Sequence, residues 1–124
     1  MKTDKDKIKE ILHVLQEGYN KRDANYIDTF MKIYSPKDNS LIIGTGLGGV
    51  FKGFEEAKGL FLDDWESWGD VKYDTPIIQI KGDMAYVFMF GKVNTADLRI
   101  TLILEKEKER WFIHHMHFSH PRNT

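Results

Sequence analysis

The chain has 124 residues, a formal charge of -1 at pH 7 and no cysteine. A chain of this length can bury one core, so we expect a single domain over residues 1–124. The balanced charge argues against a nucleic-acid partner, and the lack of cysteine excludes disulfides and cysteine-bound metals. Because there is no long apolar run and no secretory signal, we expect no membrane partner and a cytoplasmic location.

The N-terminal half of the chain has the periodicity of helices. Thr3 or Asp4 can cap a first helix, whose apolar stripe contains Ile8, Ile11, Leu12, Leu15 and Tyr19. A second, short helix is expected from Asp23, another capping residue. After a turn and a short strand at 41–43, a third helix is expected at about 54–68, with Trp65 and Trp68 on its apolar face. These helices are expected to cover a sheet.

A glycine-rich run separates the short strand from the third helix. The run, Gly44-Thr-Gly46-Leu-Gly-Gly49, fits the G-x-G-x-x-G pattern of dinucleotide-binding loops. That pattern requires a helix directly after it, so that the helix N-terminus meets the pyrophosphate. Here the segment 50–53 has the character of another strand. The glycines therefore predict a hairpin, and we expect no cofactor.

Four strands fill the C-terminal half of the chain. The segments 71–80, 84–93, 98–105 and 111–119 are rich in β-branched or aromatic residues and are separated by short turns. Helices followed by such a meander predict an α+β fold with an antiparallel sheet.

The last two strands divide their residues between two faces. A tight hairpin centred near Lys108 pairs odd with odd positions, which brings together Arg99, Thr101, His115, His117 and Ser119. The other face is apolar and contains Leu98, Ile100, Leu102, Leu104, Phe112, Met116 and Phe118. Polar groups among aromatic residues are typical of a ligand cavity, although the same pattern fits a solvent-exposed face.

The odd face supplies the first candidate site residues. His115 and His117 could transfer protons, bind a metal or only make structural hydrogen bonds. Because no third ligand is evident, we expect no metal site. Arg99 requires a carboxylate partner or an acidic ligand if it is buried.

Aromatic residues of the helices supply the second set of candidates. Tyr19, Trp65 and Trp68 either pack in the core or line a pocket for an aromatic or polycyclic ligand. No catalytic aspartate stands out, since Asp28, Asp63 and Asp64 all fit ordinary helix surfaces.

The end of the chain carries a family resemblance. Its sequence, Trp111-Phe-Ile-His-His115-Met-His117-Phe-Ser119-His-Pro121, resembles the closing strand of the SnoaL-like and calcium/calmodulin-dependent protein kinase II association-domain group. The segment 43–53 and the tripeptide Arg99-Ile-Thr101 are similar to two further strands of that group. The resemblance implies the nuclear transport factor 2-like (NTF2-like) cone, in which N-terminal helices close a curved sheet around a pocket. It also implies a homodimer through the outer face of the sheet.

Three functions are consistent with these features. The first is an isomerase, cyclase or dehydratase that transfers a proton next to a carbonyl through His115 or His117, with Arg99, Thr101 or Tyr19 holding the oxyanion. The second is a non-catalytic domain that binds a small-molecule ligand, with Ser119, Trp65 and Trp68 among its contacts. The third is an association module that forms a homo-oligomer through the apolar even face.

Overall fold

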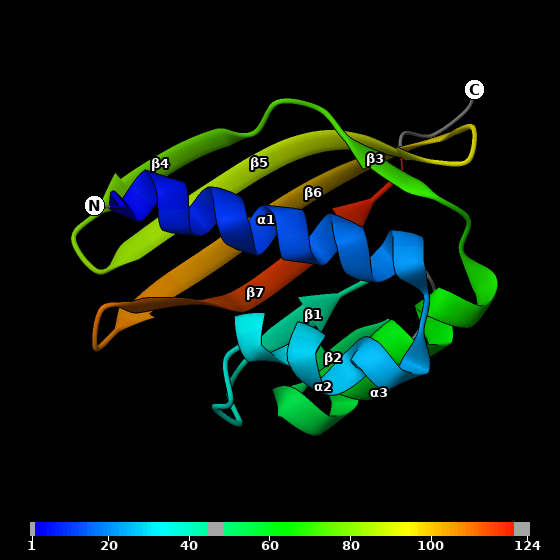
Figure 1. Cartoon of the computed structure of the whole chain (residues 1–124), viewed down its shortest axis with the longest axis horizontal. Helices are drawn as coiled ribbons and strands as arrows, with labels where there is room; N and C mark the ends of the chain where they lie inside the picture. The colour runs from blue at the N-terminus through cyan, green and yellow to red at the C-terminus, as the bar shows by residue number, and fades with distance from the viewer. Residues whose placement is uncertain (1, 45–48, 121–124) are drawn as a thin grey trace.

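The computed structural model describes residues 2–44 and 49–120. It contains helices α1 (Asp4–Lys21), α2 (Ile27–Phe30) and α3 (Gly53–Ser67), with short 3-10 turns on both sides of α2. The strands are β1 (Leu41–Ile43), β2 (Val50–Lys52), β3 (Val71–Tyr73), β4 (Ile77–Lys81), β5 (Met84–Val93), β6 (Ala96–Glu107) and β7 (Arg110–Ser119). The strands form one curved sheet, and α1 lies across it (Figure 1). The predicted α+β fold is confirmed.

The sheet has the strand order β2-β1-β7-β6-β5-β3, and β4 also pairs with β5. Strands β5, β6 and β7 form the predicted antiparallel meander, whereas β1 runs parallel to β7, so the sheet is mixed. The single strand expected at 71–80 is divided into β3 and β4. Pro76 lies in the interruption, where its lack of an N–H group prevents continuous pairing.

Strands β1 and β2 form the hairpin predicted from the glycine run, with Ile42 opposite Phe51. Residues 45–48 of that run lie outside the described residues. Helix α3 begins at Gly53, after β2. A dinucleotide-binding loop leads directly into its helix, whereas here the strand β2 lies between the glycines and α3, as predicted.

Helix α1 begins at the predicted cap. The Thr3 side chain accepts a hydrogen bond from the Asp6 backbone N–H, and the Asp6 carboxylate accepts one from the Thr3 N–H. This reciprocal capping box stabilises the first turn. The apolar stripe of α1 is buried. No helix among the described residues is both long and apolar enough to cross a membrane.

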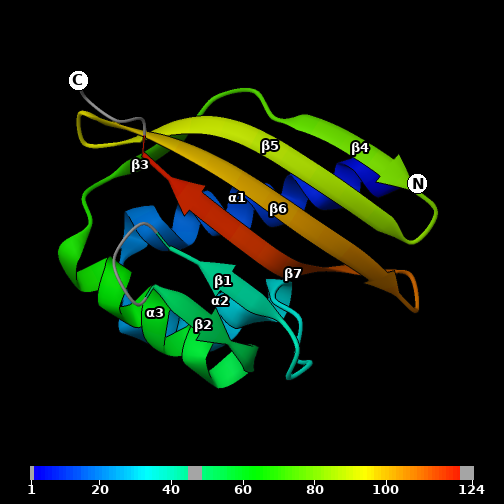
Figure 2. The ribbon, with the colours of Figure 1, turned by 180° about the vertical axis from the view of Figure 1, so that it is seen from behind.

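The two faces of β6 and β7 are the reverse of the prediction. Leu98, Ile100, Leu102 and Leu104 are fully buried beneath the helices, whereas Arg99, Thr101 and His117 are exposed on the opposite face, which we call the outer face. Figure 2 shows the outer face, with β5, β6 and β7 in front of α1. The prediction was wrong because the apolar stripes of the helices need an apolar sheet face to pack against, and the even positions provide it.

The last hairpin has the predicted odd-with-odd pairing near the end of the chain. Arg99 lies opposite Ser119, and Thr101 lies opposite His117. The pairing then shifts by one residue, because Ile103 faces His115 but Leu104 faces Ile113. His114 is therefore the extra residue of a β-bulge. This bulge reverses the side-chain alternation within β7, so that both Ile113 and His114 are buried.

Candidate functional site

A buried hydrogen-bonded pair lies between α1 and α3. The Tyr19 hydroxyl donates a hydrogen bond of 2.6 Å to Oδ2 of Asp64. Tyr19 is fully buried, and Asp64 is 7% exposed. A carboxyl group at this depth is unusual because burial disfavours its charged form. We call Tyr19, Asp64 and the nearby Tyr73 the interior cluster.

The position of Asp64 follows from the helical repeat of α3. Asp64 comes three residues after Phe61 and four before Trp68, and these spacings place all three on one face of the helix. Phe61 is buried and Trp68 packs against the core. The expectation that Asp64 lies on an ordinary helix surface was therefore wrong. The signal was an acidic residue in the middle of an apolar stripe.

Burial raises the pKa of Asp64 to about 6. The hydrogen bond from Tyr19 acts in the opposite direction, and the charge of Asp63 adds a smaller increase. Burial and the charge of Asp64 raise the pKa of Tyr19 well above its usual range. Tyr19 therefore stays protonated as a donor, while Asp64 changes its protonation state near neutral pH. This is the property that general acid–base catalysis requires.

Tyr73 is the third member of the interior cluster. Its hydroxyl oxygen is buried and has no hydrogen-bond partner among the described residues. Burial and the negative charge of Asp64 both raise the pKa of Tyr73. Its ring lies over Gly91 of β5, where an added Cβ would be 2.9 Å from the ring. Buried polar groups are rarely left unpaired, so within the described part of the chain this hydroxyl retains an unused hydrogen-bond donor.

Two amide side chains of α1 hold β3 in place. The Gln16 Oε1 accepts from the Tyr73 backbone N–H at 3.0 Å, and the Asn20 Oδ1 accepts from the Val71 N–H at 2.9 Å. Residues four apart in a helix and two apart in a strand are separated by nearly the same length, about 6 to 7 Å. The helix therefore satisfies the free edge of β3 and fixes Tyr73 relative to Tyr19.

Aromatic side chains enclose the interior cluster. The Trp68 ring lies 5.2 Å from that of Tyr19 and 6.1 Å from that of Phe118, between ring centroids. Trp65 packs against Phe30, and its indole nitrogen has no hydrogen-bond partner among the described residues. The structure thus brings together Tyr19, Trp65 and Trp68, which the sequence analysis proposed as pocket residues.

The polar residues of the predicted odd face lie elsewhere. Arg99, Thr101, His117 and Ser119 lie on the outer face, in rows that continue across β5 to Phe88 and Phe90. Arg99 donates a 3.4 Å hydrogen bond to the carbonyl of His120. These residues do not line the interior, which corrects the predicted pocket.

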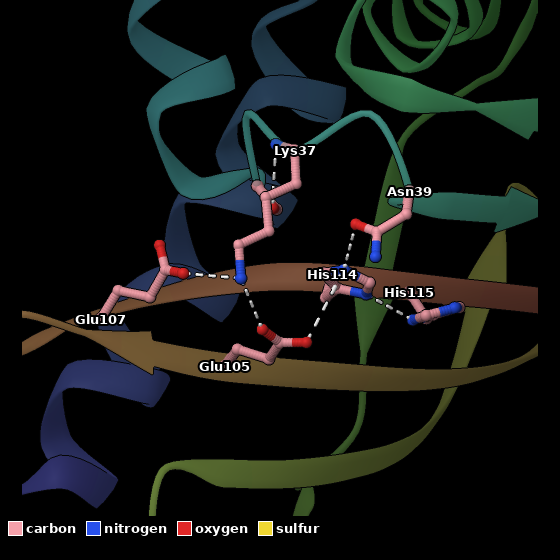
Figure 3. A network of polar contacts seen from close by, with 7 residues as sticks. Lys37, Asn39, Glu105, Glu107, His114 and His115 are labelled. Carbon is pink, nitrogen blue, oxygen red and sulfur yellow. Dashed lines mark hydrogen bonds and ion pairs between the residues drawn. The ribbon is translucent and has the colours of Figure 1, made fainter.

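His115 belongs to a separate polar network at the bulge (Figure 3). The Nδ1 atoms of His114 and His115 are 2.7 Å apart, so one ring must donate and the other accept. His114 also contacts Asn39 at 3.1 Å, and Lys37 bridges Glu105 and Glu107 of β6. Burial, followed by the neighbouring His114, lowers the pKa of His115. The network attaches the segment 35–40 to the sheet.

A cleft of about 370 Å³ opens beside the interior cluster. Helix α1, the β3–β4 connection and β5 form its walls, and Tyr73 belongs to its lining. We call it the α1–β3 cleft; its other lining residues are Lys5, Lys9, Leu12, His13, Gln16, Asp74, Thr75, Pro76 and Met89. Within residues 2–44 and 49–120, no group of three or more His, Cys, Asp or Glu side chains could hold a metal ion.

Helices packed against one curved sheet are the architecture of the cystatin-like and NTF2-like class of fold. The family model of the SnoaL-like domain matches residues 11–123. The chain therefore belongs to the SnoaL-like domain family. No curated protein matches it.

Solved structures of the same class resemble the chain over almost its whole length. An NTF2-like protein of unknown function from Shewanella oneidensis is 24% identical, with a TM-score of 0.77, covering 94% of this chain and 99% of that one. A cystatin-like protein of unknown function from Nostoc punctiforme is 17% identical, with a TM-score of 0.79 and coverages of 97% and 92%. A candidate dehydratase of the NTF2-like family from Streptomyces avermitilis is 12% identical, with a TM-score of 0.80 and 97% of each chain covered. These likenesses establish the fold.

Proposed function

We propose that this SnoaL-like protein binds a small carbonyl compound and transfers a proton next to its carbonyl group, as isomerases, cyclases and dehydratases do. The observation that carries the proposal is the buried Asp64, held by the Tyr19 hydroxyl at 2.6 Å. Asp64 takes the role that the sequence analysis gave to His115 and His117, since His117 is exposed on the outer face. We place this activity in the cytoplasm as part of the same proposal.

The interior cluster supplies the groups that such a reaction needs. The ionised Asp64 carboxylate removes a proton from the carbon next to the carbonyl, and the electron pair moves to the carbonyl oxygen. The Tyr73 hydroxyl, which has no partner among the described residues, donates a hydrogen bond to that developing oxyanion. Protonated Asp64 then returns the proton to another carbon in an isomerase, or to a leaving hydroxyl in a dehydratase.

Hydrogen–deuterium exchange tests the proposal even while the product of the reaction is unidentified. A panel of small ketones and keto acids is incubated with the protein in D₂O, and NMR follows the loss of protons next to each carbonyl. We expect exchange of at least one compound, reduced by about 10²-fold or more in Asp64→Asn. Asp63→Asn is the matched control, because Asp63 is exposed and should leave the rate unchanged.

Two results would contradict the catalytic proposal. Equal exchange rates in wild type and Asp64→Asn would remove Asp64 from the mechanism. A panel compound that raises the melting temperature but never exchanges would favour the alternative, a non-catalytic ligand-binding domain.

We also propose that the protein forms a homodimer through the outer face. The supporting observation is the exposure of large apolar side chains on β4 and β5, namely Ile77 (54%), Met84 (51%), Tyr86 (51%) and Phe90 (54%). An apolar patch on one sheet face is typical of an interface. The even-face residues named for this role in the sequence analysis are, except for the half-buried Phe112, inside the core.

Light scattering after size exclusion tests the dimer. Wild type is expected at twice the mass of one chain, and Tyr86→Glu combined with Phe90→Glu at the mass of a monomer with an unchanged circular dichroism spectrum. A wild-type monomer at about 100 μM would contradict the proposal, since stable interfaces have Kd values well below this.

A further inference from the structure

We infer that the α1–β3 cleft binds the anionic end of the ligand, so that the ligand is a small carboxylate with an apolar body. This inference rests on the proposed function and names its substrate class; Tyr73 is the member of the interior cluster that belongs to the cleft lining. It is carried by the charges at the mouth of the cleft, by its apolar lining and by the unpartnered hydroxyl of Tyr73.

Basic side chains line one side of the cleft. Lys5, Lys9 and His13 follow each other at intervals of four residues, so they lie in a row along one face of α1, about 6 Å apart. Within the described residues, neither Lys5 nor Lys9 forms an ion pair with a carboxylate. Asp74 is the acidic residue of the lining, so two lysines face one aspartate. The mouth therefore attracts an anion.

A second cleft on the other side of α1 provides a contrast. It has a volume of about 420 Å³, and three lysines belong to its lining: Lys2, which precedes the helix, Lys7 of the helix, and Lys32. There, Lys2 forms an ion pair of 2.5 Å with Glu10, and Lys7 donates to the carbonyl oxygen of Glu109 at 3.2 Å. Two of the three lysines of that lining, Lys2 and Lys7, therefore have partners. Lys5 and Lys9 of the α1–β3 cleft have no carboxylate partner in the described part of the chain and can bind a ligand.

The deeper lining of the α1–β3 cleft is apolar. Leu12, Met89 and the ring of Tyr73 form it, and they suit a hydrocarbon or aromatic body. The Tyr73 hydroxyl is buried without a partner among the described residues, and it lies within the influence of the Asp64 charge. A ligand held at the lysines by its carboxylate can therefore present a carbonyl to Tyr73.

Three related probes separate the charge from the carbonyl. The first is 3-benzoylpropionate, which has both a carboxylate and a ketone; its amide lacks the charge, and 4-phenylbutyrate lacks the ketone. Isothermal titration measures Kd for each probe at low salt. We expect the carboxylate to bind about 3- to 10-fold more tightly than the amide, which is the range for one or two exposed ion pairs.

Lysine variants assign this preference to the cleft. Lys5→Gln combined with Lys9→Gln should raise the Kd of 3-benzoylpropionate about 3- to 10-fold and leave that of the amide unchanged. Lys81→Gln combined with Lys108→Gln is the matched control, since it removes the same charge from residues outside the cleft lining. Equal losses in both double variants, or no binding of the carboxylate at millimolar concentration, would overturn the inference.

The Tyr73→Phe variant tests the inner end of the ligand. It should raise the Kd of 3-benzoylpropionate several-fold and leave the Kd of 4-phenylbutyrate unchanged, because only the ketone group can accept a hydrogen bond from the hydroxyl. The outcome is separable from that of the proposed function. Lysine-dependent binding of the carboxylate without proton exchange would support the inference and contradict the catalytic proposal. Proton exchange of neutral ketones at a rate that the lysine substitutions do not change would support the catalytic proposal and contradict the inference.

Discussion

Asp63 and Asp64 are adjacent in sequence but occupy opposite environments on α3. Asp63 is exposed, while Asp64 is buried and bonded to Tyr19. The helical repeat turns neighbouring side chains about 100° apart, so a single step in sequence separates solvent from the interior. The pair therefore provides a functional residue and its control within one dipeptide.

Asp64→Asn should stabilise the protein at alkaline pH. The folded-state pKa of Asp64, about 6, lies above its usual value of 3.8. Its protonated form therefore contributes stability that is fully present below pH 3.8 and is lost as the pH rises through 6. At pH 8 the asparagine variant should be more stable than wild type by about 1–2 kcal/mol. Urea unfolding at pH 4 and pH 8 measures this, and a variant less stable than wild type at pH 8 would refute it.

Tyr19→Phe should have the opposite effect on stability. The variant removes the hydroxyl that donates to Asp64 and leaves a buried carboxylate without its partner. We expect a loss of about 2–3 kcal/mol at pH 8, and a smaller loss at pH 5, where Asp64 is largely protonated. A loss that does not depend on pH would indicate a packing effect of the ring substitution instead.

His115 should make the protein less stable in mild acid. Burial lowers its folded-state pKa below the usual 6.5. The stability that it contributes is therefore present above pH 6.5 and is lost as the pH falls through the folded-state pKa. His115→Asn should flatten the decrease in stability between pH 7 and pH 5 relative to wild type. His13→Gln, at an exposed histidine, serves as the control, and identical slopes in all three proteins would exclude a contribution from His115.

Two glycines should respond oppositely to alanine. At Gly91 a Cβ would lie 2.9 Å from both the Lys72 carbonyl oxygen and the Tyr73 ring, so we expect a loss of about 1–3 kcal/mol and displacement of Tyr73. At Gly59 of α3 a Cβ meets nothing within 4 Å, and alanine should stabilise by about 0.5–1 kcal/mol. Thermal unfolding compares them, and equal shifts in both variants would contradict the packing described at Gly91.

Local patterns in the sequence predict the elements and part of the register. The stripe of α1, the Thr3 cap and the odd-with-odd pairing of β6 with β7 depend on neighbours in the chain or on one hairpin. The choice of buried face does not, because it depends on where the helices pack. Strand alternation also cannot reveal the bulge at His114.

The interior cluster is only partly predictable, for the same reason. Tyr19, Trp65 and Trp68 are candidates from the sequence because they are aromatic and lie on helical stripes. Asp64 is not a candidate from the sequence, because acidic residues are usually exposed. Its position between Phe61 and Trp68 nevertheless indicates that it is buried. Tyr73 cannot be connected to it from the sequence, since β3 and α3 meet only through the tertiary structure.

The pKa of Asp64 is the most direct test of the account. The ¹³C chemical shift of its carboxyl carbon can be followed by NMR from pH 3 to pH 9, and the signal can be assigned by its absence in Asp64→Asn. Our account predicts a midpoint of about 6 that moves upward in Tyr19→Phe. A midpoint near 3.8, the usual value for aspartate, would contradict the claim that Asp64 is a buried proton-transfer group.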